Sequence, residues 1–275
     1  MLKINYPMIV SDFDGTLVKE DGTIDKETKD KIAKYVNDGG IFVISTGRMP
    51  SGILSRVKEL GLKGFVSCCQ GSIIINAETE EIVLQEASPW QTTYQICRKM
   101  EELGLHIHIY GLWDYYSNMD DEALKSYENA VKSKAKFVTD MPISQFVKEK
   151  KFSSYKILAM VRPEDNAPVF QALQEAKFPN CVVTRSAAVL IEVINSNYSK
   201  GTAVEFLAQQ YNIPLEKTIG VGDQLNDLPM IQKAGLGIAV KNAASELKQE
   251  ALEFAYSNEE NAIGRIIEKY GYTEE

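Results

Sequence analysis

The sequence predicts an α/β protein in which a parallel-sheet core is interrupted by an inserted α+β module. At both ends of the chain, short unbroken apolar runs alternate with segments of helical periodicity, as expected of a parallel sheet that helices cover on both faces. In the middle of the chain, two strand-like segments alternate polar and apolar residues. This alternation is typical of an antiparallel sheet with one face open to solvent.

The amino-terminal part is predicted to form two strand–helix units followed by a third strand. Short apolar runs bounded by turn residues predict strands over residues 8–10, over residues 41–44 and near Phe65. Helical spacing of apolar residues predicts helices over residues 25–37 and about 50–60, and glycine follows each of them. The carboxy-terminal part repeats the pattern, with helices over 202–211, 227–233 and 262–270 and strands over 218–221 and 237–240.

Between these parts, the chain mixes helical and strand-like segments without a regular alternation. We expect helices over 92–103, 124–132 and 167–175, and strands over 105–110, 155–161, 181–184 and 189–194. The predicted core therefore comprises residues 1–86 and 194–275, and the predicted inserted module comprises residues 87–193.

Composition and charge exclude several classes of partner. Hydrophobic residues make up 44% of the chain and charged residues 25%, as in a soluble globular protein rather than a disordered chain. The net charge is −8 and no block of Lys and Arg offsets it, so nucleic acid and anionic membranes are not expected partners. The longest apolar run, 187–191, is far shorter than a membrane span, and the amino terminus lacks signal-peptide features. We expect a soluble, cytoplasmic protein.

The cysteines and histidines suggest a disulfide set or a metal site only weakly. Cys68 and Cys69 are neighbours, and no C-x-x-C spacing occurs with Cys97 and Cys181. His106 and His108 would share one face of a strand, but no spaced third or fourth ligand accompanies them. We interpret the cysteines as buried thiols and the histidines as polar positions on a strand.

A pair of carboxylates follows the first predicted strand in the segment Asp12-Phe13-Asp14-Gly15-Thr16. Alternation along a strand places Asp12 and Asp14 on one side, while Phe13 points the other way. Ligands bind at the carboxyl ends of strands in open parallel sheets. Two neighbouring carboxylates also push their pKa values apart, so one stays an anion while the other carries a proton. The pair therefore suits a nucleophile beside a general acid.

Three further segments favour binding of a phosphate or a cation. Ser45-Thr46-Gly47-Arg48 offers a hydroxyl and backbone N–H groups to an anion, although S-T-G turns are common. Ser199-Lys200-Gly201-Thr202 places a lysine, more often a solvated surface residue, at a helix start. In the segment 220–227, Asp223 and Asp227 suit a hard cation such as Mg²⁺. A nucleotide-binding glycine loop does not fit there, because Leu225 occupies the third glycine position.

The four segments D-F-D-G-T, S-T-G-R, S-K-G and G-D-Q-L-N-D, in this order, resemble the motifs of the haloacid dehalogenase superfamily of phosphohydrolases. The long insertion between the second and third segments resembles the Cof-type branch, whose cap is an α/β module at this place. The resemblance covers the whole chain. It implies a Rossmann-like parallel-sheet core with helices on both faces and an inserted α+β cap that determines substrate specificity.

The resemblance also implies a role for each motif residue. Asp12 would attack the phosphorus and form an aspartyl-phosphate, while Asp14 would protonate the leaving alcohol and then activate water. Thr46 and the backbone N–H of Gly47 would hold the phosphoryl oxygens, and Lys200 would neutralise their charge. Asn226 would hydrogen-bond near the phosphoryl group. The implied Mg²⁺ ligands are the Asp12 carboxylate, the Asp14 carbonyl and Asp223, with Asp227 orienting this shell.

Three segments depart from the habits of this branch. Cys69-Gln70-Gly71-Ser72 replaces a common Asn-Gly-Ala, Val240-Lys241-Asn242-Ala243 replaces Met-Gly-Asn-Ala, and Ala262-Ile263 replaces Gly-Val. None of these changes removes an implied catalytic group. The first two border the substrate entrance of the family fold, so they weaken the transfer of any particular substrate preference.

The expected function is Mg²⁺-dependent hydrolysis of a small phosphorylated metabolite, such as a sugar phosphate or a nucleotide-like cofactor phosphate. A phosphotransferase or phosphomutase using the same site and a non-catalytic sensor of a phosphorylated ligand are the alternatives. We expect a monomer or a homodimer. A nicotinamide or flavin oxidoreductase is disfavoured, because the glycine fingerprint is missing. Candidate contacts to the leaving group in the cap are Trp90, His106, His108, Trp113, Tyr115, Tyr116 and Arg185.

Overall fold

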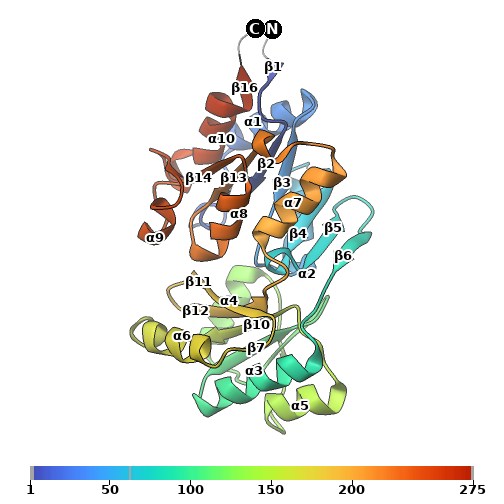
Figure 1. Cartoon of the computed structure of the whole chain (residues 1–275), viewed down its shortest axis with the longest axis vertical. Helices are drawn as coiled ribbons and strands as arrows, with labels where there is room; N and C mark the ends of the chain where they lie inside the picture. Colours follow the sequence, from blue (N-terminus) through green and yellow to red (C-terminus); the bar gives the residue numbers. More distant parts are fainter. Residues whose placement is uncertain (1–2, 62, 274–275) are drawn as a thin grey trace.

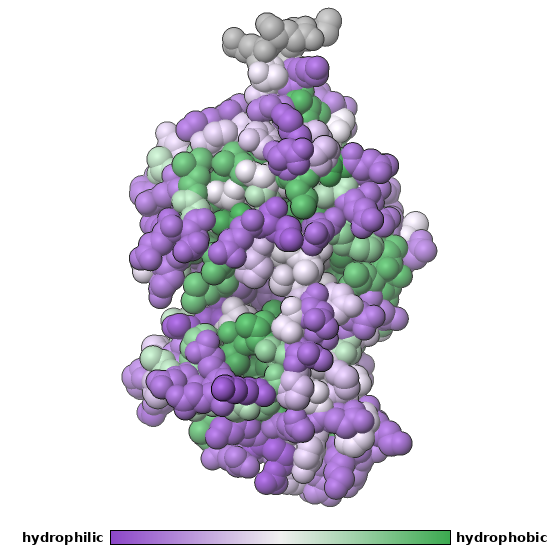
Figure 2. All heavy atoms as spheres, viewed as in Figure 1, coloured by the Kyte–Doolittle hydropathy of each residue, from purple (hydrophilic) through white to green (hydrophobic). Residues whose placement is uncertain are grey.

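The computed structural model describes residues 3–61 and 63–273 and consists of two lobes, one above the other in Figure 1. We call the lower lobe, residues 90–195, the cap, and the rest the core. The ends of the described chain meet in the core, where β1 (Lys3–Ile4) pairs antiparallel with β16 (Tyr272–Thr273). Within the described residues, no helix is long and apolar enough to cross a membrane. Hydrophilic residues dominate the visible surface of both lobes (Figure 2).

The core is built around a five-stranded parallel sheet of order β15-β14-β13-β2-β3. Its strands are β2 (Met8–Ser11), β3 (Ile41–Ile44), β13 (Thr218–Gly222), β14 (Leu236–Ala239) and β15 (Leu252–Glu253). The centre of the sheet joins distant parts of the sequence, since Ile9 of β2 lies opposite Ile219 of β13. The chain leaves this sheet after β3 and returns to it at β13, so the cap is inserted between the two halves.

Helices cover both faces of the parallel sheet. Along β2, Ile9 belongs to the apolar layer that contains residues of α1 and α10, whereas Met8 and Val10 belong to the layer with α7 and α8. The core helices are α1 (Lys26–Asn37), α2 (Pro50–Glu59), α7 (Lys200–Gln210), α8 (Leu228–Lys233), α9 (Ser245–Lys248) and α10 (Ala262–Ile266). The predicted α/β class, with a parallel core sheet covered on both sides, is confirmed.

A small antiparallel sheet leads from the core to the cap. It consists of β4 (Phe65–Cys68), β5 (Ile73–Asn76) and β6 (Ile82–Gln85). A bridge between Ser45 and Ser67 attaches this sheet to the end of β3. The turn between β4 and β5 therefore lies next to the S-T-G-R segment.

The cap contains a six-stranded sheet of order β11-β12-β10-β7-β8-β9, antiparallel except for the β8–β9 pair. Its strands are β7 (His106–Tyr110), β8 (Tyr115–Ser117), β9 (Lys136–Phe137), β10 (Lys156–Met160), β11 (Cys181–Ala187) and β12 (Leu190–Asn195). The cap helices are α3 (Trp90–Glu102), α4 (Glu122–Val131), α5 (Ile143–Lys150) and α6 (Asn166–Glu175). Alternation places Ile107 and Ile157 in the apolar layer under α3 and α5, whereas Lys156 and Glu192 face the core.

Some elements differ from their predictions. The carboxy-terminal helix ends as an α-helix at Ile266, and Ile267–Gly271 continues as a π-helical turn. The predicted helix over 227–233 is preceded by a 3₁₀ turn, Leu225–Asp227, so α8 starts one residue later. Helix α5 and strands β8 and β9 were not predicted, because such short segments contain too few apolar positions to reveal a period.

Two glycines with nearly the same positive φ test how tightly the β4–β5 turn packs. Gly39 (φ +98°) and Gly71 (φ +99°) both adopt a conformation that disfavours a side chain, but only Gly71 faces a backbone atom. A Cβ at Gly71 would lie 2.2 Å from the Ser199 carbonyl oxygen, whereas a Cβ at Gly39 would meet nothing within 4 Å.

We expect Gly39→Ala to lower the free energy of unfolding by about 1–2 kcal/mol through backbone strain alone. Gly71→Ala should cost roughly 1–3 kcal/mol more, because the carbonyl of Ser199 must move. Urea unfolding followed by circular dichroism measures both values. Equal losses in the two variants would show that the turn tolerates the added methyl group.

Candidate active site

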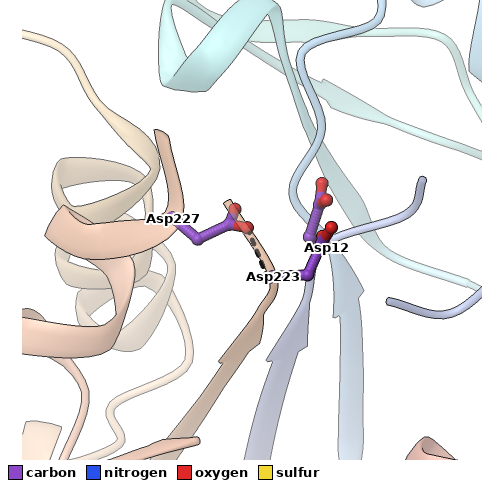
Figure 3. A group of neighbouring side chains, drawn as sticks. All are labelled: Asp12, Asp223 and Asp227. Carbon is purple, nitrogen blue, oxygen red and sulfur yellow. Dashed lines mark hydrogen bonds between the residues drawn. The ribbon is translucent and has the colours of Figure 1, made fainter. Parts of the chain in front are cut away.

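The polar motif residues meet at the carboxyl ends of adjacent parallel strands. Asp12 follows β2, Thr46 follows β3 and Asp223 follows β13. The backbone N–H of Asp12 donates to the carbonyl oxygen of Val221 (2.9 Å), which continues the strand pairing up to the site. Figure 3 shows Asp12 and Asp223 side by side at the strand ends, with Asp227 approaching from the following loop. The sheet register thus brings together segments that are far apart in the sequence.

Lys200 provides the positive charge of this site. It is the first residue of α7, whose start is fixed by reciprocal side-chain capping between Ser199 and Thr202. Its Nζ is buried and donates to Asp12 Oδ1 (2.5 Å) and Asp227 Oδ1 (2.6 Å). Burial by itself would lower the pKa of Lys200. The carboxylates of Asp12 and Asp227 together raise this pKa by more than burial lowers it, so the net shift is upward. Lys200 is therefore a buried ammonium group rather than the ordinary surface lysine considered from the sequence.

Asp227 organises the loop that carries Asp223. Its Oδ2 accepts the backbone N–H groups of Asp223 (2.9 Å) and Gln224 (3.0 Å), while Oδ1 faces Lys200. The dashed line in Figure 3 marks the bond to Asp223. Asp227 thus fixes both the loop conformation and the lysine.

Asp12 and Asp223 are harder to ionise than exposed carboxylates, because both are buried close to Asp227. Burial, followed by the Asp227 carboxylate, raises the pKa of Asp12, and Lys200 partly opposes this rise. The same two causes raise the pKa of Asp223 to about 6. Thr16 Oγ1 donates to Asp223 Oδ1 (2.8 Å) and favours the ionised form. A nearby divalent cation would favour the ionised form of both groups.

The three buried carboxylates fit a hard divalent cation. Asp12, Asp223 and Asp227 each offer an oxygen, and these oxygens lie within 4.8 Å of one another. Lys200 compensates one of the three negative charges, so the group retains an excess of negative charge. Carboxylate oxygens without sulfur or imidazole are the ligands that Mg²⁺ prefers.

Asp14 points away from the carboxylate cluster toward Arg48. Its half-exposed carboxylate accepts two hydrogen bonds from that guanidinium group, from Nε to Oδ2 and from Nη2 to Oδ1 (both 2.7 Å). The same Arg48 donates to the carbonyl oxygens of Ala130 (3.1 Å) and Val131 (3.4 Å) at the end of α4. Arg48 therefore ties a core carboxylate to the cap. It stands within the S-T-G-R segment but was not selected from the sequence.

Gln70 and Lys156 make a second connection between core and cap. Gln70, in the left-handed region (φ +60°), donates from Nε2 to Glu192 and accepts from Asn226 Nδ2 (3.1 Å). Lys156 Nζ donates to the carbonyl oxygen of Gly47 (2.7 Å) and to Glu192 Oε1 (3.1 Å). The Cys-Gln-Gly-Ser departure from the family pattern thus places a long amide side chain against the cap.

A cavity of about 260 Å³ lies between the two lobes at this point. The predicted residues that line it are Asp12, Asp14, Thr46, Gly47 and Asn226. Residues that were not predicted also line it, namely Arg48, Gln70, Tyr127, Ala130, Val131, Lys156, Ser186, Ala187, Leu190 and Glu192. Lys200, Asp223 and Asp227 are not among the lining residues and lie buried behind Asp12. The structure therefore gathers all eight predicted site residues in and directly behind one cavity.

The candidate leaving-group contacts in the cap do not line this cavity. Arg185 stacks on Phe170 (4.3 Å from guanidinium carbon to ring centre) in the layer under α6. Tyr116 packs with Phe146 and Phe152 on the same side of the sheet. Their assignment as contacts to the leaving group stays a prediction, and the structure shows Arg185 and Tyr116 packed against aromatic rings of the cap. The lining residues that were not predicted include both polar and apolar side chains, and no local sequence pattern distinguishes them.

The cysteines form no disulfide among the described residues, and the histidines take part in hydrogen bonds within the cap. All four cysteines are free, and burial raises the pKa of Cys68 well above its ordinary value. His106 and His108 face each other, with Nε2 atoms 3.2 Å apart, in a hydrogen-bonded row on β7 that continues to Tyr110. Cys68, Cys69 and Cys97 are buried, as interpreted, whereas Cys181 is half-buried, and the two histidines occupy polar positions on a strand.

Comparison with known proteins identifies the family. The model of the haloacid dehalogenase-like hydrolases matches residues 9–267. A protein of Haemophilus influenzae is 31% identical over 96% of this chain and 98% of its own length. The Bacillus subtilis 5-amino-6-(5-phospho-D-ribitylamino)uracil phosphatase YitU is 27% identical over 96% of this chain and 97% of its own. A solved haloacid dehalogenase-like hydrolase from B. subtilis superposes with a TM-score of 0.86 at 24% identity, covering 96% and 99% of the two chains.

The chain belongs to the haloacid dehalogenase-like hydrolases. The predicted resemblance, including the Cof-type branch and the assignment as a phosphatase, is confirmed. The roles of the individual residues and the domain boundaries at 87 and 193 stay predictions.

Cation binding can be detected from the stability of the protein without measuring activity. We expect Mg²⁺ to raise the thermal midpoint of the metal-free protein, because at 100 times its dissociation constant a ligand stabilises the native state by about 2.7 kcal/mol. Asp223→Asn should reduce this shift, since it removes one charged oxygen ligand. Asp114→Asn is the control, because Asp114 is a half-exposed carboxylate of the cap. An unchanged shift in Asp223→Asn would exclude Asp223 as a ligand.

Proposed function

We propose that this phosphatase hydrolyses small phosphorylated metabolites, such as a sugar phosphate or a nucleotide-like cofactor phosphate, with Mg²⁺ and through an aspartyl-phosphate on Asp12. The contact that carries the proposal is the one between Asp12 and the buried Lys200 ammonium (2.5 Å), directly behind a cavity that also contains Asp14 and Thr46. The ribitylaminouracil phosphate in the name of the relative YitU is a small metabolite of this kind.

In the first half of the proposed reaction, a carboxylate oxygen of Asp12 attacks the phosphorus, and the bond from phosphorus to the alcohol oxygen breaks. Lys200 offsets the negative charge of Asp12 and of the phosphoryl group. The hydroxyl of Thr46 and the amide of Asn226 line the cavity and are available to the phosphoryl oxygens. Asp14 takes up a proton from solvent once it has left Arg48, and gives that proton to the departing alcohol oxygen. Because Asp14 is bonded to Arg48 in this structure, it must first turn away from that guanidinium group.

In the second half, Asp14 takes a proton from a water molecule, whose oxygen attacks the phosphorus of the aspartyl-phosphate. The bond between phosphorus and Asp12 breaks, which releases inorganic phosphate and restores the carboxylate. The cap lies over the cavity and is held there by the contacts of Arg48 with Ala130 and of Gln70 with Glu192. Its position limits the size of the leaving group.

Asp12 and Asp223 would hold Mg²⁺, and Asp227 would keep the loop that carries Asp223 in place. When bound, Mg²⁺ supplies positive charge that stabilises the transferring phosphoryl group. The compact group of three carboxylates, with only one lysine to balance it, supports this part of the proposal.

Replacing Asp12 tests the covalent mechanism. We expect Asp12→Asn to reduce phosphate release from p-nitrophenyl phosphate by at least about 10³-fold, since an amide cannot act as the nucleophile. Phosphate release with Mg²⁺ and with EDTA is measured in both proteins, and circular dichroism verifies the fold of the variant. Wild-type rates in Asp12→Asn would overturn the mechanism.

Analysis of the products distinguishes water from a second hydroxyl as the acceptor. We expect one equivalent of free phosphate for each ester consumed, because the proposed second step transfers the phosphoryl group to water. An isomerised phosphate ester would instead indicate a mutase. Binding of phosphorylated ligands without any turnover would indicate a sensor.

A further inference from the structure

The two histidines of the chain lie side by side in the cap, outside the phosphoryl site. They are two residues apart on β7, so both side chains lie on the face of the sheet that packs against Tyr127 of α4. His108 is fully buried, and His106 is 6% exposed. No third ligand could be found near them in the sequence, but β8 places Ser117 opposite His108. The fold thus supplies an oxygen next to two imidazoles.

The rings of His106 and His108 are arranged like two ligands of one metal ion. Their Nε2 atoms are 3.2 Å apart, and their ring centres are 4.9 Å apart. Two imidazole nitrogens that bind one zinc ion at about 2.0–2.1 Å lie about 3.2–3.4 Å apart, with ring centres about 5 Å apart. A straight N–H···N hydrogen bond of the same length would separate the ring centres by about 5.5 Å. The observed spacing therefore fits two lone pairs that meet at one point.

Hydrogen bonds alone leave this cluster one proton short. Four contacts need a donor: His106 Nδ1 with Asp121 Oδ2 (3.2 Å), His106 Nε2 with Ser117 Oγ (2.9 Å), the contact between the two Nε2 atoms, and Ser117 Oγ with the carbonyl oxygen of Met119 (2.8 Å). Two neutral imidazoles and one hydroxyl carry only three protons. In agreement, the buried His106 Nδ1 is left without a hydrogen bond. A metal ion bound to both Nε2 atoms and to Ser117 Oγ removes the deficit, because the proton of His106 is then free to face Asp121.

Both rings are available as neutral ligands. Burial lowers the pKa of His106, and the Asp121 carboxylate only partly opposes this effect. Burial, followed by the neighbouring His106, holds the pKa of His108 well below its ordinary value. A cavity of about 630 Å³ that is lined by His106 and Asp121 gives an ion a way in and gives water room as a further ligand. Arg162, a cation that lines the same cavity, is paired with Asp165 (2.7 Å).

We propose that His106 and His108, together with Ser117 Oγ, bind one divalent ion of the class that prefers nitrogen ligands, such as Zn²⁺. This site is separate from the carboxylate cluster of the core, whose oxygen ligands suit Mg²⁺. Asp121 orients His106 from the Nδ1 side, as carboxylates commonly do for ligating histidines. Asp121 also caps α4 by accepting the backbone N–H of Leu124 (2.9 Å). The bound ion therefore ties the start of α4 to the cap sheet.

Nitrogen NMR of the full chain without an affinity tag tests the site directly, because the chain contains only these two imidazoles. Protein labelled with ¹⁵N-histidine is titrated with Zn²⁺ at pH 7, with excess Mg²⁺ present to occupy the core carboxylates. We expect the Nε2 signals of both rings to change together and to saturate at one equivalent of Zn²⁺. Imidazole signals that do not respond to Zn²⁺ would overturn the proposal. So would a protonated ring that persists with Zn²⁺ present, because a proton would then be the cation between the rings.

Substitutions around the rings measure what single groups contribute, with the Zn²⁺ affinity determined by competition with a chromophoric chelator. His106→Gln should weaken Zn²⁺ binding by about 100-fold or more, because it removes a ligand. Asp121→Asn should weaken it by about ten- to hundredfold, the usual effect of removing the partner that orients a ligating histidine. Asparagine still caps α4, so the helix start is preserved. Asp120→Asn is the matched control, because Asp120 is exposed and contacts neither imidazole in the described structure.

Hydrogen exchange tests the effect of the ion on α4. Zn²⁺ should slow exchange of the Leu124 amide in the wild type and leave it unchanged in His106→Gln. Equal Zn²⁺ affinity in the wild type and His106→Gln would refute the site, and so would an equal loss of affinity in Asp120→Asn and Asp121→Asn. Circular dichroism verifies the fold of each variant. If His106→Gln does not fold, the NMR titration and the two aspartate variants decide the question.

Discussion

The buried ammonium group of Lys200 is the interaction on which the site depends. It lies between Asp12 and Asp227, which would otherwise repel each other away from solvent. Removing one partner of a buried ionic group typically costs about 3–5 kcal/mol, because a charge is left without compensation. Lys200 is also the first residue of α7, where the chain returns from the cap to the core. Lys200 therefore both holds the carboxylates of the site and anchors the chain at the point where it leaves the cap.

The core half of the site could be predicted because each of its residues depends on local sequence. Asp12, Thr46 and Asp223 each come one residue after a short apolar run, and parallel strands bring their carboxyl ends to one edge of the sheet. The pattern of each segment thus predicted both the type of reactive side chain and its place at the edge of the sheet. The environment of Lys200 was less accessible, because a lysine at a helix start is usually solvated. Its burial results from the packing of α7 under the ends of β2 and the loop after β13.

The cap half of the site could not be predicted in this way. Lys156 contacts Gly47 from 109 residues away, and Gln70 contacts Glu192 from 122 residues away. Such pairs follow from the placement of one lobe on the other, which no local period reveals. The candidates from the sequence included Tyr115 and Tyr116, which in this cap pack against other aromatic rings, Tyr110 and Phe146. From the alternation, the polar side of the cap strands was expected to face solvent, but Lys156 of β10 and Glu192 of β12 face the core.

The contacts that hold the cap on the core also line the active-site cavity. Arg48 joins Asp14 to α4, Gln70 joins Asn226 to Glu192, and Lys156 reaches Gly47. A leaving group that binds among these side chains must replace some of their hydrogen bonds, so occupancy and cap position are linked through the same atoms. In the proposed mechanism Asp14 is affected most directly, since its proton transfer requires the release of Arg48, which also contacts the cap. Recognition of the leaving group would then be linked to the availability of the proposed acid.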